Sequence, residues 1–184
     1  MFKHLWLAAV FIGIFLTPTV LAEPPAGFWQ NPVIKAAGEM HPLPEAAFQP
    51  QKDVTYKALF SITRDQKDVK SINDGLDHVA RAINVLASAG VPLEHLKFVV
   101  IIHGGAVPMV LDNAHYRKEF GVDNPNLTLI KQLKTAGVEL AVCGQALAGY
   151  KYKDSWVTPD VKVALSALST IIILQQQGYA LIPM

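Results

Sequence analysis

Residues 98–105 have the sequence FVVIIHGG, and this stretch decides the fold class. Its first five residues are apolar, and β-branched or aromatic side chains of this kind favour a strand. A strand with one face in water alternates apolar and polar residues, whereas this stretch has no polar residue before His103. We therefore predict a strand of a parallel sheet that helices cover on both faces.

Strand-like and helix-like segments alternate on both sides of this stretch. The apolar runs typical of strands occupy residues 56–62, 98–102, 138–142, 161–165 and 179–182. Helices are predicted over residues 71–89, from Asn124-Pro125 to Gly137, from Gly144 through Leu147, and over 169–177. One unbroken helix over residues 161–177 is an alternative. The alternation predicts an α/β fold, a three-layer α/β/α sandwich around a mainly parallel five-stranded sheet.

The helix predicted over residues 71–89 has recognisable ends. Ser71 is expected to cap its N-terminus with Asp74 as the capping partner, and Gly90 suits its C-terminus. Its apolar residues recur at helical spacing, so one face is expected to lie against the sheet.

The composition excludes several functional classes. The 184 residues include 16 basic and 15 acidic side chains, whereas a nucleic-acid-binding protein normally has a basic excess. One cysteine excludes an intrachain disulfide and a thiolate-rich zinc site. The chain also contains no GxGxxG, Gly-x-Ser-x-Gly or phosphate-binding-loop motif. We expect no nucleic acid partner, no cofactor and no metal.

Residues 1–22 have the pattern of a signal peptide. Lys3 and His4 precede the apolar run from Leu5 to Leu16, and Val20-Leu21-Ala22 fits the rule for cleavage after Ala22. A run of about 12 residues is shorter than the roughly 20 that span a membrane, so cleavage is favoured over an uncleaved anchor. We predict a periplasmic or secreted protein with no stable membrane insertion after cleavage.

Residues 23–52 are predicted to form a proline-rich extended arm, followed by one α/β domain over residues 53–184. The arm contains half of the 12 prolines, which rules out a long helix or a central strand. It also contains Phe28, Trp29 and Phe48, and is therefore too apolar for a freely solvated linker. We expect it to lie on its own domain or on a neighbouring subunit.

Two candidate site segments follow predicted strands: His103-Gly104-Gly105 and Cys143-Gly144-Gln145. Ligands of parallel α/β sheets bind beyond the carboxyl ends of the strands. A thiol at the first turn of a helix is stabilised as the nucleophilic thiolate, although a cysteine also packs well as a small apolar residue. His103 is a candidate base or orienting residue, or a structural residue bonded to a backbone carbonyl. The backbone N–H groups of Gly104 and Gly105 are candidates for binding an anion.

A second group of polar residues comprises Asp112, His115, Tyr116 and Glu119. His115 and Glu119 are four residues apart, a spacing that places two metal ligands on one helix face. No HExxH motif accompanies them, so a solvated helix face is favoured.

Several segments together resemble the DsrE/DsrF-like family over roughly residues 55–183. They are the strand at 98–104 ending in His-Gly, the start Asn124-Pro125-Asn126, the block GVELAVCGQ at 137–145, and Gln176-Gln177-Gly178-Tyr179. The resemblance implies a three-layer α/β/α subunit that assembles into trimers or hexamers. In the sulfur-relay members the cysteine at the matching position carries sulfur as a persulfide and passes it to a partner protein. The resemblance therefore implies that Cys143 is the sulfur acceptor.

Three functional hypotheses follow. The first is a periplasmic sulfur-handling protein that accepts sulfane sulfur on Cys143 from a donor protein and passes it on, with His103 assisting. Such a carrier or transferase need not show turnover alone. The second is a non-catalytic, homo-oligomeric binding or assembly module of the same fold with a structural cysteine. The third is a metal carrier that uses His103, His115 and Glu119.

Overall fold

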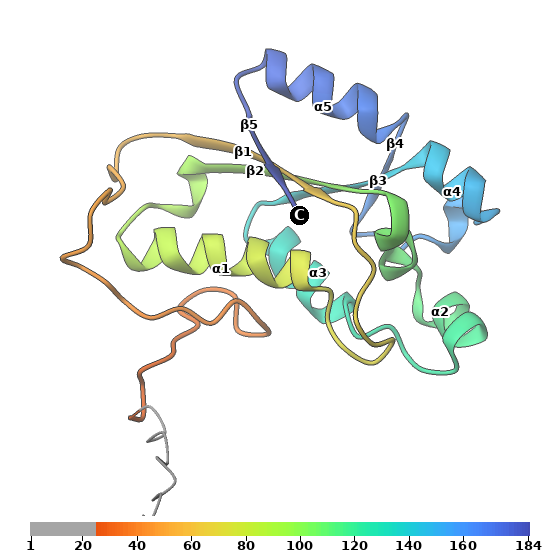
Figure 1. The fold of residues 1–184 in the computed structure, drawn as a ribbon, viewed down its shortest axis with the longest axis horizontal. Coiled ribbons are helices and arrows are strands. Elements are labelled where there is room, and N and C mark those ends of the chain that lie inside the picture. Colours follow the sequence, from red (N-terminus) through yellow and green to blue (C-terminus); the bar gives the residue numbers. More distant parts are fainter. Residues whose placement is uncertain (1–24) are drawn as a thin grey trace, which may run out of the picture.

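A computed structural model of the protein describes residues 25–184. The predicted signal peptide therefore lies outside the described residues. The described chain forms a five-stranded sheet, parallel throughout, in the order β4-β3-β2-β1-β5 (Figure 1). The strands are β1 (Tyr56–Ile62), β2 (Leu96–Ile102), β3 (Glu139–Cys143), β4 (Lys162–Ala164) and β5 (Ala180–Pro183).

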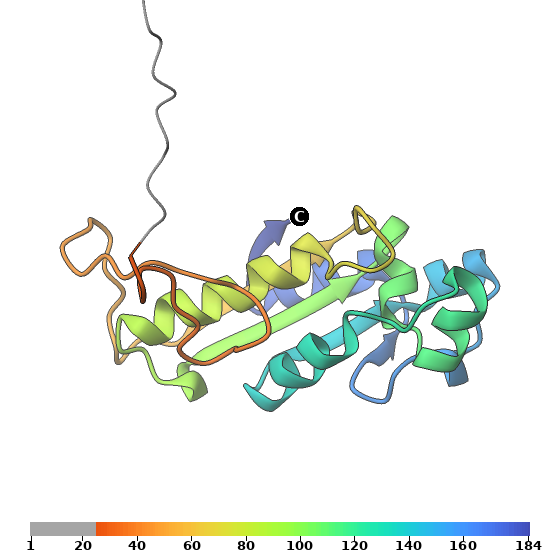
Figure 2. The same ribbon diagram turned by 90° about the horizontal axis from the view of Figure 1, so that it is seen from below.

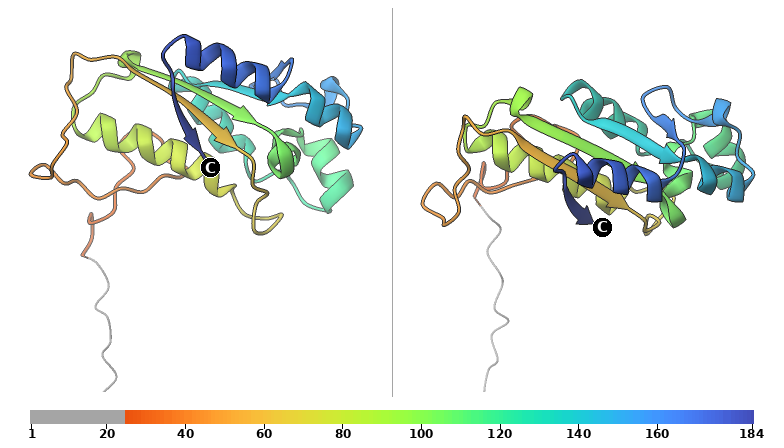
Figure 3. Two further views of the ribbon diagram at one scale, coloured as in Figure 1. Left: turned by 45° about the horizontal axis from the view of Figure 1, so that its top comes forward. Right: turned by 90° about the horizontal axis from the view of Figure 1, so that it is seen from above.

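Helices cover both faces of this sheet. The α-helices are α1 (Asp74–Ser88), α2 (Asn113–Phe120), α3 (Leu127–Thr135), α4 (Gly144–Tyr150) and α5 (Ala167–Gln176). Helices α1 and α3 lie on one face (Figure 2), and α5 lies on the opposite face (Figure 3). Short 3₁₀ turns occupy Leu93–His95, Gly104–Val110 and Asp154–Trp156. The predicted three-layer α/β/α sandwich is confirmed.

The central strands owe their apolar composition to burial on both faces. Successive side chains of a strand point to opposite faces. Accordingly, Val100 and Ile102 of β2 belong to the core under α1 and α3, whereas Val99 and Ile101 belong to a smaller core under α5. All four are at most 8% exposed. An unbroken apolar run is what a strand between two helical layers needs.

The structure corrects two details of the predicted helices. Helix α1 begins at Asp74, and its cap is Asn73, whose side chain accepts a hydrogen bond from the Gly75 N–H at 2.8 Å. Ser71 does not cap it, because its hydroxyl donates to the Asp68 carbonyl in the preceding turn. The unbroken helix over residues 161–177 is wrong, since β4 pairs with β3 before α5 begins at Ala167.

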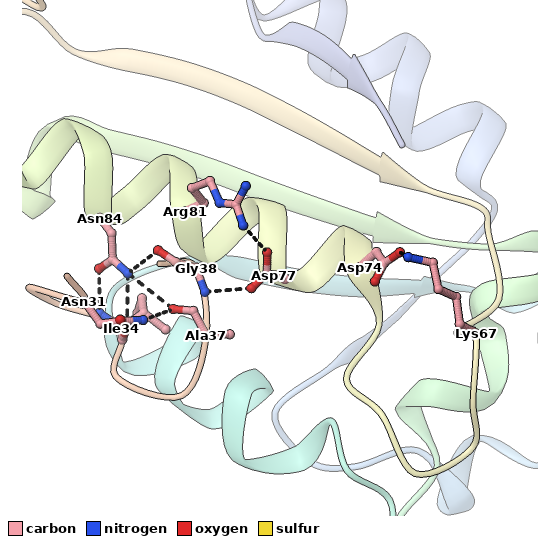
Figure 4. A network of polar contacts seen from close by, with 9 residues as sticks. All are labelled: Asn31, Ile34, Ala37, Gly38, Lys67, Asp74, Asp77, Arg81 and Asn84. Atoms are coloured by element: carbon pink, nitrogen blue, oxygen red, sulfur yellow. Dashed lines mark hydrogen bonds and ion pairs between the residues drawn. The ribbon is translucent and has the colours of Figure 1, made fainter. Parts of the chain in front are cut away.

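The segment from residue 25 to β1 lies along α1 and contains no helix or long strand. It doubles back at the antiparallel bridge between Gln30 and Met40. Asn84, fully buried on α1, holds this segment (Figure 4). Its Oδ1 accepts from the N–H groups of Val33 and Ile34 at 3.0 and 2.9 Å, and its Nδ2 donates to the Gly38 carbonyl at 3.0 Å.

Two further contacts fix the arm. The Gly38 N–H donates to Oδ1 of Asp77 on α1 at 2.7 Å. Oε1 of Gln132 on α3 accepts from the backbone N–H groups of Lys35 and Ala36. The arm is therefore attached to its own domain by side chains of both helices on that face. None of the helices in residues 25–184 has the length and apolar character that crossing a membrane requires.

Candidate functional site

The carboxyl edge of the sheet places His103 and Cys143 on neighbouring strands. Ile102 of β2 is in register with Val142 of β3, so His103 and Cys143 occupy the next position on each chain. Both belong to the side of the sheet that α5 covers, since side chains alternate along a strand. Neighbouring strands are about 4.8 Å apart, so the two residues predicted as a site lie at one edge of the sheet.

Cys143, the single cysteine of the chain, is buried. It is 6% exposed and packs with Leu59, Ile101 and Ala167 in the core under α5. It stands immediately before α4, as the sequence predicts, but its side chain makes no capping hydrogen bond. On the side that faces this core, the Cys143 thiol therefore contacts apolar side chains.

The loop between β4 and α5 covers the segment that begins at Cys143. A Cβ placed on Gly144 would lie 2.8 Å from the Ala164 carbonyl oxygen, so only a glycine permits this approach. Nε2 of Gln145 donates to the Leu165 carbonyl at 3.3 Å. The end of β4 and the residue after it therefore pack directly against Gly144 and Gln145, the two residues that follow Cys143.

His103 forms a hydrogen bond that the sequence did not predict. Its Nε2 lies 2.8 Å from Oγ of Ser61, which ends the α5-facing side of β1 and is 7% exposed. Burial lowers the pKa of His103, so the imidazole is neutral near pH 7. Within residues 25–184 no hydrogen bond joins His103 to Cys143. The ring is paired with β1 rather than with the thiol on β3.

The sequence does not identify Ser61 as a site residue, because a single serine in an apolar strand belongs to no motif. The available signal was its position: it is the only polar residue in the second half of the run YKALFSI. A buried hydroxyl needs a hydrogen-bond partner, and the partner comes from a strand 42 residues away.

Gly104 and Gly105 lie against the loop that follows β1. A Cβ on Gly104 would lie 3.2 Å from the Thr63 carbonyl oxygen, and one on Gly105 would lie 3.3 Å from the Asp65 nitrogen. The two glycines thus allow close packing of two loops beside His103.

The second group of polar residues predicted from the sequence comprises Asp112, His115, Tyr116 and Glu119, and these residues form hydrogen bonds with different partners. Asp112 caps α2, and its Oδ1 accepts from the His115 N–H and lies 2.8 Å from His115 Nδ1. Burial opposes ionisation of Asp112, but the hydrogen bonds from His115 outweigh it and lower the pKa of this carboxyl. Glu119 instead accepts the hydroxyl hydrogen of Tyr152. In the described part of the chain, no three His, Cys, Asp or Glu side chains are grouped to hold a metal ion.

Tyr116 departs from the predicted solvated face. It is 1% exposed, and its hydroxyl donates to the Val69 carbonyl at 2.9 Å. The ring of His115 stacks on Trp156 with centroids 4.5 Å apart. This helix face is therefore partly a packing surface between α2 and its neighbouring loops.

Most of the chain is similar to a known protein family. The model of the DsrE/DsrF-like family matches residues 57–184. A solved structure of a protein of unknown function from Methanobacterium thermoautotrophicum is similar, with a TM-score of 0.51 and 19% identity. The match covers 70% of this chain and 99% of that chain, and at this identity it shows the fold alone. No curated protein is significantly similar to the chain.

Proposed function

Because the chain belongs to the DsrE/DsrF-like family, we propose that it is a periplasmic sulfur-handling protein that carries sulfane sulfur on Cys143. One observation carries this proposal. The family match spans residues 57–184, and within it the single cysteine of the chain stands at the carboxyl end of β3. This edge of a parallel sheet is where α/β proteins place their chemistry.

The proposed step is a transfer of one sulfur atom between thiols. The Cys143 thiolate attacks the outer sulfur of a donor persulfide, R–S–SH. The new S–S bond forms on Cys143 as the donor S–S bond breaks, and the donor leaves as the thiolate R–S⁻. The outer sulfur keeps its hydrogen, so the products are Cys143–S–SH and R–S⁻ and no further oxidant is needed. The same exchange then passes the sulfur on: the thiolate of an acceptor protein attacks the outer sulfur of Cys143–S–SH, the S–S bond on Cys143 breaks, and the Cys143 thiolate leaves.

In this proposal His103 accepts the thiol proton of Cys143. Its neutral imidazole is the form that acts as a base. If the Ser61 hydroxyl accepts a hydrogen bond from Nε2, Nδ1 is left unprotonated and is the ring nitrogen that can act as a base. Ser61 then selects the tautomer of His103.

Intact-mass measurement after exposure to polysulfide tests the proposal. The native protein is expected to gain one or more sulfur atoms, removable by a reductant, while Cys143→Ser gains none. Cys143→Ala is a second control, because it removes the thiol without adding a hydroxyl to an apolar site. Equal sulfur loading of the native protein and both variants would reject Cys143 as the acceptor.

The burial of Cys143 favours a second candidate function. At 6% exposure the side chain has the environment of a structural cysteine in a non-catalytic assembly module. Alkylation of the native protein separates the two functions. A thiol that reacts before denaturation supports the carrier, whereas one that reacts only after denaturation supports the assembly module.

We also propose that the subunit forms a homo-oligomer through the outer face of α5. Leu168, Ile172 and Ile173 on this helix are each at least half exposed, and Leu165 before it is 77% exposed. Contiguous apolar surface of this kind marks an interaction site. Light scattering is expected to show a trimer or hexamer that Leu168→Lys dissociates.

The proposed export has its own test. If the signal peptide is cleaved after Ala22, N-terminal sequencing of the exported protein is expected to begin at Glu23.

A further inference from the structure

A cavity of about 410 Å³ lies between the arm and helix α3. Val33 and Ile34 of the arm line it together with Leu93, which precedes β2, and one face of α3 completes the wall. We call this cavity the arm groove. Gln132 of α3 holds the two arm residues that follow Ile34, so the arm stays at its edge (Figure 4). Cavities that bind small molecules have volumes of roughly 300–1,000 Å³, so this one is large enough for a ligand.

The arm groove is separate from the proposed sulfur site. Ile34 belongs to the core under α1 and α3, whereas Cys143 belongs to the smaller core under α5, on the opposite face of the sheet. A ligand in the groove therefore does not touch the thiol, and its binding can be measured independently of sulfur loading.

The groove is elongated and its walls are mostly apolar. The residues of α3 and its C-terminal end that line it recur at helical spacing and form one helix face: Thr128, Lys131, Gln132, Thr135 and Ala136. This face is about 12 Å long at 1.5 Å per residue. The Thr135 hydroxyl donates to the Lys131 carbonyl at 2.9 Å, and Oε1 of Gln132 accepts from the arm backbone. An extended hydrocarbon chain fits such a surface, because these two polar groups already have partners.

The charge of the groove favours an anion. Lys131 is the only charged residue that lines it, and within residues 25–184 its ammonium forms no ion pair. Two charged residues adjoin lining residues on the opposite wall, Lys35 and Glu94, and their charges offset each other. Thr128 lies one helical turn before Lys131 on the same face. An ammonium and a hydroxyl at this spacing can donate to the two oxygens of one carboxylate.

We propose that the arm groove binds a medium- or long-chain fatty carboxylate. The hydrocarbon chain lies along α3, against Val33 and Leu93, and the carboxylate lies at Lys131 and Thr128. One cationic group toward one end of an apolar groove fits a free carboxylate with a single chain. This binding activity goes beyond the proposed sulfur handling and does not depend on it.

Calorimetric titration with decanoate tests the proposal on the chain from Glu23 onward, which contains every helix and strand described. The native protein is expected to bind decanoate, and Lys131→Gln is expected to weaken binding at least about threefold, because the carboxylate loses its cation. Lys134→Gln is the matched control. It makes the same charge change on the same exposed helix, but Lys134 does not line the groove, so native affinity is expected.

Two further ligands separate the roles of chain and head group. Hexanoate keeps the carboxylate but lacks four methylenes, and is expected to bind at least about tenfold more weakly than decanoate. Decanol keeps the chain length without the charge. It is expected to bind the native protein more weakly than decanoate does, and Lys131→Gln is expected to leave its affinity unchanged.

Methyl NMR locates the bound ligand. Decanoate is expected to shift the methyl signals of Val33, Leu93 and Ala136, which line the groove. Shifts found only for methyl groups outside the groove would place the ligand elsewhere and overturn the proposal. Absence of decanoate binding overturns it too, as does an equal loss of affinity in the two lysine variants. Equal affinities of the native protein for decanoate and decanol would refute recognition of the carboxylate.

Discussion

Replacing Gly38 with alanine tests whether the arm is packed against α1 as tightly as the structure shows. Gly38 has φ of +75°, and a Cβ added there would lie 2.3 Å from the Arg81 nitrogen and 2.5 Å from the Ala80 carbonyl carbon. Both are backbone atoms of α1, so no side-chain rotation relieves the overlap. The arm and the helix must move apart.

The expected change in the free energy of unfolding follows from three contributions. A left-handed conformation costs a non-glycine residue roughly 1–2 kcal/mol, and loss of glycine freedom in the unfolded chain returns about 0.4–1 kcal/mol. Forcing a methyl group into a packed contact costs roughly 1–3 kcal/mol. Gly38→Ala is therefore expected to lower the free energy of unfolding by about 1–5 kcal/mol.

Gly27 is the matched control. It lies in the same arm with φ of +82°, and a Cβ there would meet no atom within 4 Å. Gly27→Ala carries the backbone strain without the overlap, so it is expected to lower the free energy of unfolding by about 1.6 kcal/mol or less.

Equilibrium urea denaturation, followed by circular dichroism, measures both variants. The difference between them isolates the contact between the arm and α1. Hydrogen exchange of the arm amides shows whether the arm separates before the domain unfolds. Equal free energies of unfolding for the two variants, with equal exchange, would refute the close packing.

Three other predictions concern single side chains. Asn84→Asp places a carboxylate before the carbonyls of Ile34, Ala37 and Gly38 and is expected to lower the free energy of unfolding by about 3–5 kcal/mol in urea at pH 7. Burial raises the pKa of the new carboxyl, so this loss is expected to shrink as the pH falls and the carboxyl is protonated. Burial lowers the pKa of His103 from 6.5. As the pH falls, the unfolded chain therefore binds a proton at His103 before the folded chain does. The stability linked to the neutral ring is therefore present above pH 6.5 and is lost as the pH falls. In thermal denaturation, His103→Gln is expected to lose less stability on acidification than the native protein does. Gly144→Ala forces residues 164–166 away and is expected to speed alkylation of native Cys143, whereas Gly149→Ala in the same helix, with open space around it, is not. Equal alkylation rates for these two variants would show that the loop does not control access.

Several features of the protein were determined by its sequence. The unbroken apolar run at 98–102 requires burial on both faces, and the alternation of strands and helices then requires parallel strands. The same reasoning places His103 and Cys143 at the carboxyl edge of the sheet, because each follows directly on an apolar strand. These features are local, because periodicity within about ten residues carries them.

Other features were decided only by the tertiary structure. Asn84 is a polar residue on the buried face of α1, which signals a hydrogen-bonding role, but its partners lie about 50 residues earlier in a segment without periodicity. Ser61 and His103 meet because β1 and β2 are in register. Gln145, two residues after Cys143, donates a hydrogen bond to a carbonyl 20 residues later in the chain. A sequence pattern reports how each segment buries its own apolar face, whereas hydrogen bonds and close contacts between distant segments are set when those faces pack together.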